Sequence, residues 1–169
     1  MSGGQPAIRG FLVQTLIALL EALKDKPPWT SVTLEPNLTS DKVDILWEYR
    51  DGSRKAVQVK SSQNPFCKAE VQQWAADLQA GKEAGRYELI LVGPTTPAVA
   101  TLGRVGDVAV PTPKNLDLAA FKSDAAHQLH GLLPKLGLPP RSAEQLDELV
   151  ALLIENLASG SVDGRTLTR

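Results

Sequence analysis

Hydrophobic residues recur every three or four positions over residues 10–24 of this 169-residue chain. This spacing is typical of an amphipathic helix, and Pro27-Pro28 predicts that the helix ends before them. The hydrophobic stripe consists of Leu12, Leu16, Leu19, Leu20 and Leu23.

Three segments with strand-like patterns follow this helix. Hydrophobic and polar residues alternate over 29–35, and segments 42–49 and 55–61 are rich in the residue types that strands favour. Residues 50–54, between the last two segments, contain an Asp51-Gly52 pair, which predicts a hairpin.

A second helix and a fourth strand complete the predicted core. Helical spacing of hydrophobic residues predicts a helix over 68–83, and the short run 87–92 is typical of a strand buried on both faces. Because a helix connects strands 55–61 and 87–92, we expect these strands to be parallel. The sequence thus predicts an α/β fold with a mixed sheet flanked by helices.

The pattern is weaker after Gly93, where we expect one more strand over 105–110 and a helix over 116–133. Pro139-Pro140 marks a boundary, and a capping box over 142–145 predicts the start of a last helix.

The last predicted helix has a leucine-rich stripe that needs a partner. That partner is this core, a second copy of the chain, or a domain absent from it. We divide the chain into a domain over 1–138 and a C-terminal helical extension over 139–169, with a flexible tail after Ala158.

The composition limits the kinds of function that the chain supports. It is 43% hydrophobic and 22% charged, with a formal net charge of −1, so nucleic-acid binding would need a local basic patch or a second subunit. The single cysteine, Cys67, excludes an internal disulfide.

No basic leader precedes a hydrophobic stretch, and the longest hydrophobic run, 11–23, is too short to span a bilayer. We expect a cytoplasmic protein without a membrane segment.

Polar residues in two predicted strands carry the candidate chemistry. Side chains alternate along a strand, so Gln58 and Lys60 share one face, where an amide and an ammonium are costly to bury without partners. Asp44 lies in the preceding strand.

The length of the hairpin loop decides which residue faces Asp44. A tight turn at Asp51-Gly52 would place Asp44 opposite Val59. A three-residue loop over 51–53, which pairs Arg50 with Arg54, would place Asp44 opposite Lys60, and this is the register that we expect.

The order of elements and the pattern Asp44 … Gln58-Val59-Lys60 resemble the restriction-endonuclease-like superfamily, the PD-(D/E)xK nucleases. More narrowly, the chain is similar to nuclease domains at the N-termini of bacterial antiphage proteins. It departs from the superfamily pattern at Gln58, where the usual residue is Asp or Glu. The residues that carry the resemblance are Gly10, Phe11, Gln14, Glu35, Asp44, Gln58, Val59, Lys60 and Ser61.

The resemblance implies a restriction-endonuclease-like core and Mg²⁺-dependent hydrolysis of DNA phosphodiester bonds, in which Mn²⁺ can replace Mg²⁺. It assigns Asp44 as the principal metal ligand, with the Gln58 amide oxygen and the Val59 carbonyl as further ligands. It assigns Lys60 to orient or deprotonate the attacking water and to stabilise the phosphate.

One further carboxylate is expected to supply the negative charge that an amide at position 58 lacks. The candidates are Glu35 and Glu21.

The implied partners are double-stranded DNA, further copies of the chain in a homo-oligomer, and a C-terminal NTPase or sensor module absent from this chain. Two other functions stay open. One is a catalytically degenerate nuclease fold that acts as a DNA-binding or oligomerisation module, and the other is a ribonuclease.

Each candidate also has a simpler interpretation. Asp44 and Lys60 can face solvent at strand ends, and Glu35 can pair with a lysine. Gln14 and Glu21 lie on the helix face opposite the leucine stripe, which is typical of exposed residues.

Aromatic and histidine residues outside this set are interpreted more simply. Phe66 and Trp74 are expected in the core. His127 and His130 are expected to be surface or interface residues.

Overall fold

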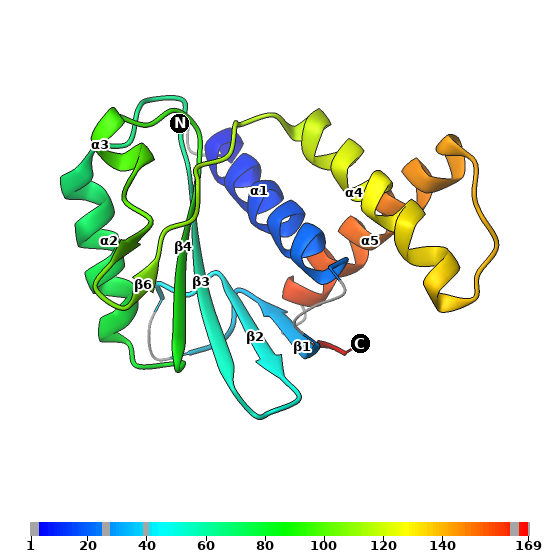
Figure 1. Cartoon of the computed structure of the whole chain (residues 1–169), viewed down its shortest axis with the longest axis horizontal. Coiled ribbons are helices and arrows are strands. Elements are labelled where there is room, and N and C mark those ends of the chain that lie inside the picture. The colour runs from blue at the N-terminus through cyan, green and yellow to red at the C-terminus, as the bar shows by residue number, and fades with distance from the viewer. Residues whose placement is uncertain (1–3, 25–27, 39–40, 163–165, 169) are drawn as a thin grey trace.

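A seven-stranded mixed sheet lies between two layers of helices in the computed structural model, which describes residues 4–24, 28–38, 41–162 and 166–168 (Figure 1). One layer contains α1 (Gly4–Ala22), α4 (Leu118–Leu132) and α5 (Ala143–Val162). The other contains α2 (Lys68–Ala80) and the short α3 (Pro97–Ala100). The predicted α/β fold with a mixed sheet flanked by helices is confirmed.

The strand order in the sheet is β5-β6-β4-β3-β2-β1-β7. β2 is antiparallel to β1 and β3, whereas β3 and β4 are parallel, as the helical connection predicted. The order helix, three strands, helix, strand is observed, and the restriction-endonuclease-like core stays a prediction. The strands are β1 (Trp29–Leu34), β2 (Ile45–Tyr49), β3 (Arg54–Ser61), β4 (Arg86–Val92), β5 (Arg104–Val105), β6 (Val108–Ala109) and β7 (Leu167–Thr168).

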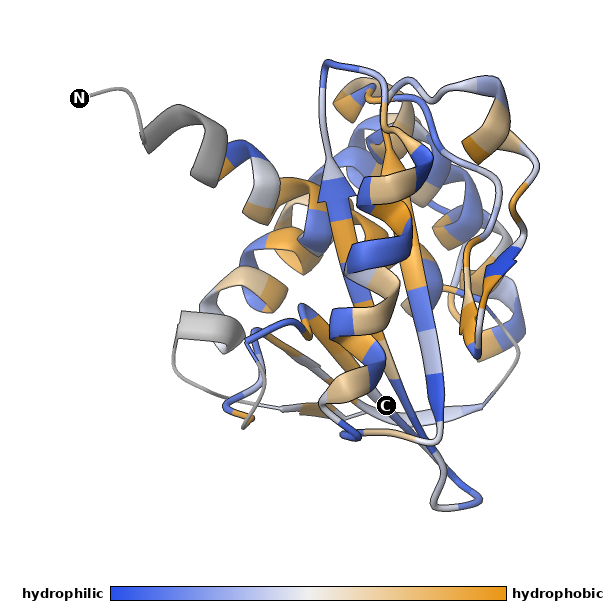
Figure 2. Cartoon of the chain, turned by 90° about the vertical axis from the view of Figure 1, so that its left-hand side faces the viewer, coloured by the Kyte–Doolittle hydropathy of each residue, from blue (hydrophilic) through white to orange (hydrophobic). Residues whose placement is uncertain are grey.

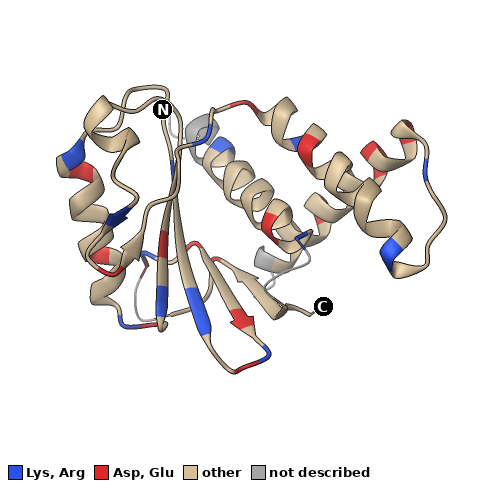
Figure 3. Cartoon of the chain, in the orientation of Figure 1, with Lys and Arg blue, Asp and Glu red and all other residues tan. Residues whose placement is uncertain are grey.

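Each face of the sheet has its own hydrophobic cluster. Neighbouring strand residues point to opposite faces, so Ile45 packs with α1, α4 and α5, and Leu46 packs with α2. Figure 2 shows the hydrophobic positions of the central strands behind the helix nearest the viewer. Lysines, arginines and acidic residues are interspersed over the elements in the view of Figure 3, which fits the net charge of −1.

The region between β4 and α4 differs from the prediction. The expected single strand over 105–110 is wrong, because β5 and β6 form a short antiparallel hairpin with Gly106 at φ 56°. A glycine adopts this left-handed conformation without the steric cost that a side chain adds. The helix expected over 116–133 is α4, which continues into a 3₁₀ helix, η1 (Leu133–Leu136).

Helix α5 packs against this core. Leu146, Val150 and Leu157 are buried in the same cluster as α1, so the partner of its leucine-rich stripe is this core. The expectation of a loose tail after Ala158 is wrong for the described residues. α5 extends to Val162, and β7 pairs with the outer edge of β1, where backbone groups would otherwise be unpaired.

Among the described residues, no helix combines the length and hydropathy needed to cross a bilayer.

Candidate functional site

Asp44 lies where the ends of β1, β2 and β3 meet. Its backbone N–H donates to the carbonyl of Val57 (2.9 Å), and its own carbonyl accepts from the N–H of Glu35 (2.8 Å). Its carboxylate Oδ2 accepts from the N–H of Val59 (2.6 Å). The carboxylate thus takes the place of a backbone acceptor beside β3, which fixes the orientation of the side chain.

The hairpin loop has three residues, as expected, but different ones. They are Arg50, Asp51 and Gly52, since the N–H of Tyr49 donates to the carbonyl of Ser53 (3.0 Å). The reason is the last loop position, which is left-handed in such hairpins: Gly52 has φ 76°, and the predicted loop would have placed Ser53 there.

The predicted pairing of Arg50 with Arg54 is therefore wrong. Arg54 pairs with Glu48, and the same register continued to the start of β2 places Asp44 next to Gln58 instead of opposite Lys60. A shift of two residues keeps every side chain on its predicted face, so Asp44, Gln58 and Lys60 stay together.

The Asp44 carboxylate is costly to ionise. Burial raises its pKa, and the nearby Glu35 carboxylate raises it further. Hydrogen bonds from Val59 and Gln14 and the charge of Lys60 lower it, and the resulting pKa is about 6. Four groups from other parts of the sequence therefore interact with this carboxylate.

Glu35 is the second carboxylate of the site. It is mostly exposed, but partial burial raises its pKa, and a hydrogen bond from Gln14 lowers it. Its backbone has φ 45°, a left-handed conformation that is uncommon for a residue with a side chain. Such strain is frequent at functional sites.

Gln14 acts on both carboxylates, because its side chain lowers the pKa of Glu35 and of Asp44. Its Oε1 is buried and has no hydrogen-bond partner among the described residues. Gln14 does lie opposite the leucine stripe, but it is half-buried and not one of the exposed residues that this position predicted.

Gln58 is buried, with 2% of its surface exposed. Its Oε1 also has no hydrogen-bond partner among the described residues. A buried amide oxygen without a donor is unfavourable, and a cation or a bound ligand would satisfy it.

Lys60 is half-buried, and its ammonium lies 5.5 Å from the centroid of the Trp74 ring. The sequence pattern did not predict Trp74 at this site. Its spacing within α2 predicted a core residue, yet it lies at the edge of the helix's buried face, next to the Lys60 side chain.

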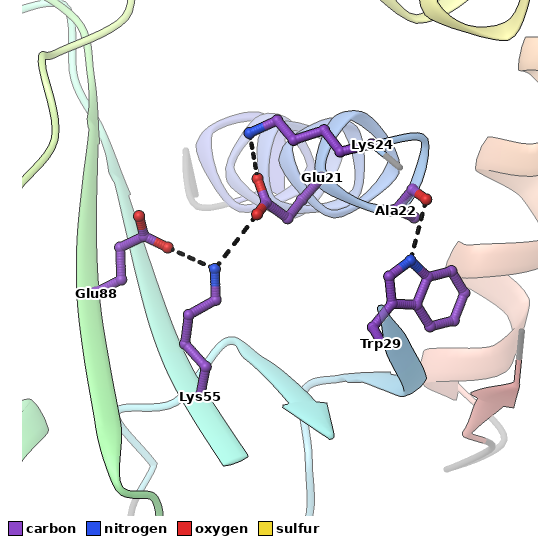
Figure 4. Close-up of polar contacts among 6 residues, drawn as sticks. All are labelled: Glu21, Ala22, Lys24, Trp29, Lys55 and Glu88. Atoms are coloured by element: carbon purple, nitrogen blue, oxygen red, sulfur yellow. Dashed lines mark hydrogen bonds and ion pairs between the residues drawn. The ribbon is translucent and has the colours of Figure 1, made fainter. Parts of the chain in front are cut away.

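Glu21 is not brought to Asp44. It forms ion pairs with Lys24 (2.6 Å) and Lys55 (3.5 Å), and Lys55 also pairs with Glu88 (2.9 Å) (Figure 4). A carboxylate shared by two ammonium groups does not fit the predicted role of a metal ligand. For Val59, the structure shows the N–H bound to Asp44, and a metal-binding role of its carbonyl stays a prediction.

The oxygen atoms at Asp44 fit a hard divalent cation such as Mg²⁺ or Mn²⁺. Asp44 and Glu35 supply carboxylates, and the unpartnered amide oxygens of Gln14 and Gln58 are neutral ligands of the kind that these ions accept. No cluster of three or more His, Cys, Asp or Glu side chains suited to a metal occurs within the described ranges. A metal site here would therefore depend on amide oxygens as well as carboxylates.

A groove with a volume of about 750 Å³ lies away from this site, between α4 and α5. His127 and His130 line it, together with Lys122 and Asp147. The two histidines are exposed, which agrees with their interpretation as surface residues.

No family model matches the sequence, and no curated protein matches it. Solved structures do share its fold. The chain is similar to the SAVED/CARF-domain-containing receptor Cap4 of Moraxella osloensis, with 13% identity and a TM-score of 0.65 over 95% of this chain and 44% of that chain.

Cap4 receptors from Acinetobacter baumannii are similar as well. One structure matches with 12% identity and a TM-score of 0.60 over 96% of this chain and 43% of that chain. Another, with the cyclic trinucleotide 3'3'3'-cAAA, matches with 12% identity and a TM-score of 0.60 over 95% of this chain and 41% of that chain. The chain thus spans less than half the length of these receptors, and the likeness concerns the fold alone.

Proposed function

We propose that the chain is a metal-dependent nuclease domain that hydrolyses DNA phosphodiester bonds. The observation that carries the proposal is the convergence on one half-buried carboxylate, Asp44, of a second carboxylate, two amide side chains and an ammonium. A carboxylate whose pKa is raised by burial and by a second carboxylate, beside amide oxygens without donors, is typical of a site that binds a cation.

In this proposal Asp44, Glu35 and Gln58 hold the ion. A bound divalent cation supplies the positive charge that activates water and neutralises the phosphate in phosphodiester hydrolysis. Lys60 contacts a phosphate oxygen and stabilises the negative charge that develops on it. Gln14 stabilises the charged form of both carboxylates.

The biological setting that we propose is antiphage defence, with this domain as the effector of a longer protein. The support is the resemblance to antiphage nuclease domains and the shared fold with Cap4 receptors, of which the chain covers less than half. A chain with a net charge of −1 attracts DNA weakly, so we propose that it cleaves DNA as an oligomer.

Cleavage of supercoiled plasmid with Mg²⁺ or Mn²⁺, at raised protein concentration, tests the proposal. Asp44→Asn and Lys60→Met are expected to lose at least about 100-fold in rate, the usual effect of removing such groups. Asp147→Asn and Lys122→Met are matched controls, since both side chains are exposed in the α4–α5 groove. Equal cleavage rates for wild type and the four variants would refute the proposed nuclease activity of this site. The same series of proteins on an RNA substrate distinguishes a ribonuclease from a DNA nuclease.

A second candidate is a non-catalytic module that binds nucleic acid or assembles the protein. The amide at position 58 favours it, because this residue removes a negative charge from the metal site. DNA binding by gel shift without cleavage in any metal would support it. Because one similar receptor was solved with a cyclic trinucleotide, calorimetry with that ligand is included. Two carboxylates facing each other repel a phosphate ligand, so we expect no binding at Asp44 without a cation.

A further inference from the structure

Lys60 lies near two carboxylates but is paired with neither. Its charge lowers the pKa of both Asp41 and Asp44, yet none of the salt bridges among the described residues includes it. Asp41 pairs with Lys42 instead (2.9 Å). The Lys60 ammonium lies over the Trp74 ring, at a centroid distance of 5.5 Å that is within the range of cation–π attraction.

The Trp74 ring is held from behind by Phe66. The two rings meet edge to face, with centroids 5.7 Å apart and an interplanar angle of 86°. Phe66 is buried, its N–H donates to the carbonyl of Pro94 (3.0 Å), and its carbonyl accepts from the N–H of Thr96 (3.1 Å). The position of the ring is therefore fixed by α2 and by the segment that follows β4.

An aromatic ring and a carboxylate have different effects on an ammonium. The ring attracts the cation without cancelling its charge, whereas a salt bridge neutralises both partners. Asp44 already accepts a hydrogen bond from the Val59 N–H. A bond from Lys60 would occupy further lone pairs and remove the negative charge that a metal ion needs.

We propose that Trp74 is a positioning residue that holds the Lys60 ammonium over its ring and away from Asp44. Asp44 then stays free for the divalent cation, and the ammonium stays free for a substrate phosphate. This inference rests on the proposed function, because it assumes that the cation binds at Asp44.

Mn²⁺ affinity, measured by calorimetry without DNA, tests the inference in a set of variants. Trp74→Leu is expected to bind Mn²⁺ about tenfold more weakly than wild type, because Lys60 then pairs with Asp44. Trp74→Phe keeps an aromatic ring and is expected to stay within about threefold of wild type. The double variant Trp74→Leu/Lys60→Met is expected to bind as tightly as Lys60→Met alone.

The double variant distinguishes positioning from packing. If it binds Mn²⁺ as weakly as Trp74→Leu, Trp74 acts through the packing of α2 and the inference is overturned. Wild-type affinity in Trp74→Leu also overturns it. If wild type binds no Mn²⁺, or Asp44→Asn binds it equally well, the proposed function itself fails.

The NMR signals of the Lys60 ε-methylene group give a readout that needs no metal, and the wild-type signal decides the inference even if Trp74→Leu does not fold. A ring-current shift to high field is expected in wild type and Trp74→Phe, and its loss is expected in Trp74→Leu. An unshifted signal in wild type would show that the ammonium does not lie over the ring, and the inference would fall.

Discussion

Replacement of Asp44 by Asn is expected to stabilise the metal-free protein at neutral pH. Burial and Glu35 raise the pKa of Asp44 from an ordinary value of 3.8 to about 6. The folded protein therefore binds the Asp44 proton more tightly than the unfolded chain does. This contribution to stability is present below about pH 4 and is lost as the pH rises through 6.

The size of the effect follows from the same pKa values. A difference between 3.8 and about 6 corresponds to about 3 kcal/mol at neutral pH, the cost of keeping this carboxylate ionised in the fold. Asn carries no charge, and its Oδ1 still accepts the Val59 N–H. For a chain of this length, about 3 kcal/mol raises the midpoint of thermal unfolding by roughly 6–12 °C.

Thermal and urea unfolding from pH 4 to pH 8, with a chelator present, measure the difference. The Asp44→Asn variant is expected to be more stable than wild type at pH 7.5 and equally stable near pH 4. Addition of Mn²⁺ is expected to stabilise wild type and to leave Asp44→Asn unchanged. Asp147→Asn, which changes an exposed carboxylate, is the control. A variant less stable than wild type at pH 7.5 would refute the reasoning about desolvation.

Variants at three other positions test the surroundings of the site by urea unfolding. Glu35→Asn is expected to be about 1 kcal/mol more stable than Glu35→Gln, because Asn tolerates the left-handed backbone at φ 45°; equal stability would contradict this. Gly93→Ala is expected to lose at least about 2 kcal/mol, since its Cβ would overlap the Ser62 carbonyl, whereas Gly85→Ala has free space and is the control. Lys55→Met leaves Glu21 and Glu88 without their shared cation and is expected to lower the free energy of unfolding by about 3 kcal/mol. Lys122→Met, at an exposed position, is the control and is expected to lose no stability.

The face of the sheet that carries the site was predictable because alternation along a strand depends only on sequence. Gln58 and Lys60 are two residues apart and had to share a face. The register was not predicted correctly because it depends on which loop residue takes the left-handed position. Gly52 does so, and the pairing moved by two residues without changing the face.

The positions of Gln14 and Glu21 show what helical spacing leaves open. Seven residues place both on one face of α1, but also about 10 Å apart along its axis. Gln14 therefore reaches the Asp44 end of β3, and Glu21 reaches Lys55 near the other end. Only the direction in which α1 crosses the sheet separates these two roles, and periodicity contains no information about it.

Trp74 could not be assigned for a different reason. Hydrophobic spacing identifies the buried face of α2, and Trp74 belongs to that face next to Val71 and Leu78. Its contact with Lys60 requires the parallel β3–β4 pair to bring α2 beside the end of β3, which is a tertiary arrangement.

Asp44 has two roles that a single substitution can separate. Its carboxylate accepts a hydrogen bond that joins the strand ends, and in the proposed mechanism it also holds the cation. Asp44→Ala removes both, so a loss of cleavage would not distinguish misfolding from missing chemistry. Asp44→Asn keeps the acceptor and removes the charge. Loss of cleavage together with higher stability at neutral pH would then assign the charge to catalysis, because the variant stays folded and lacks only the negative charge.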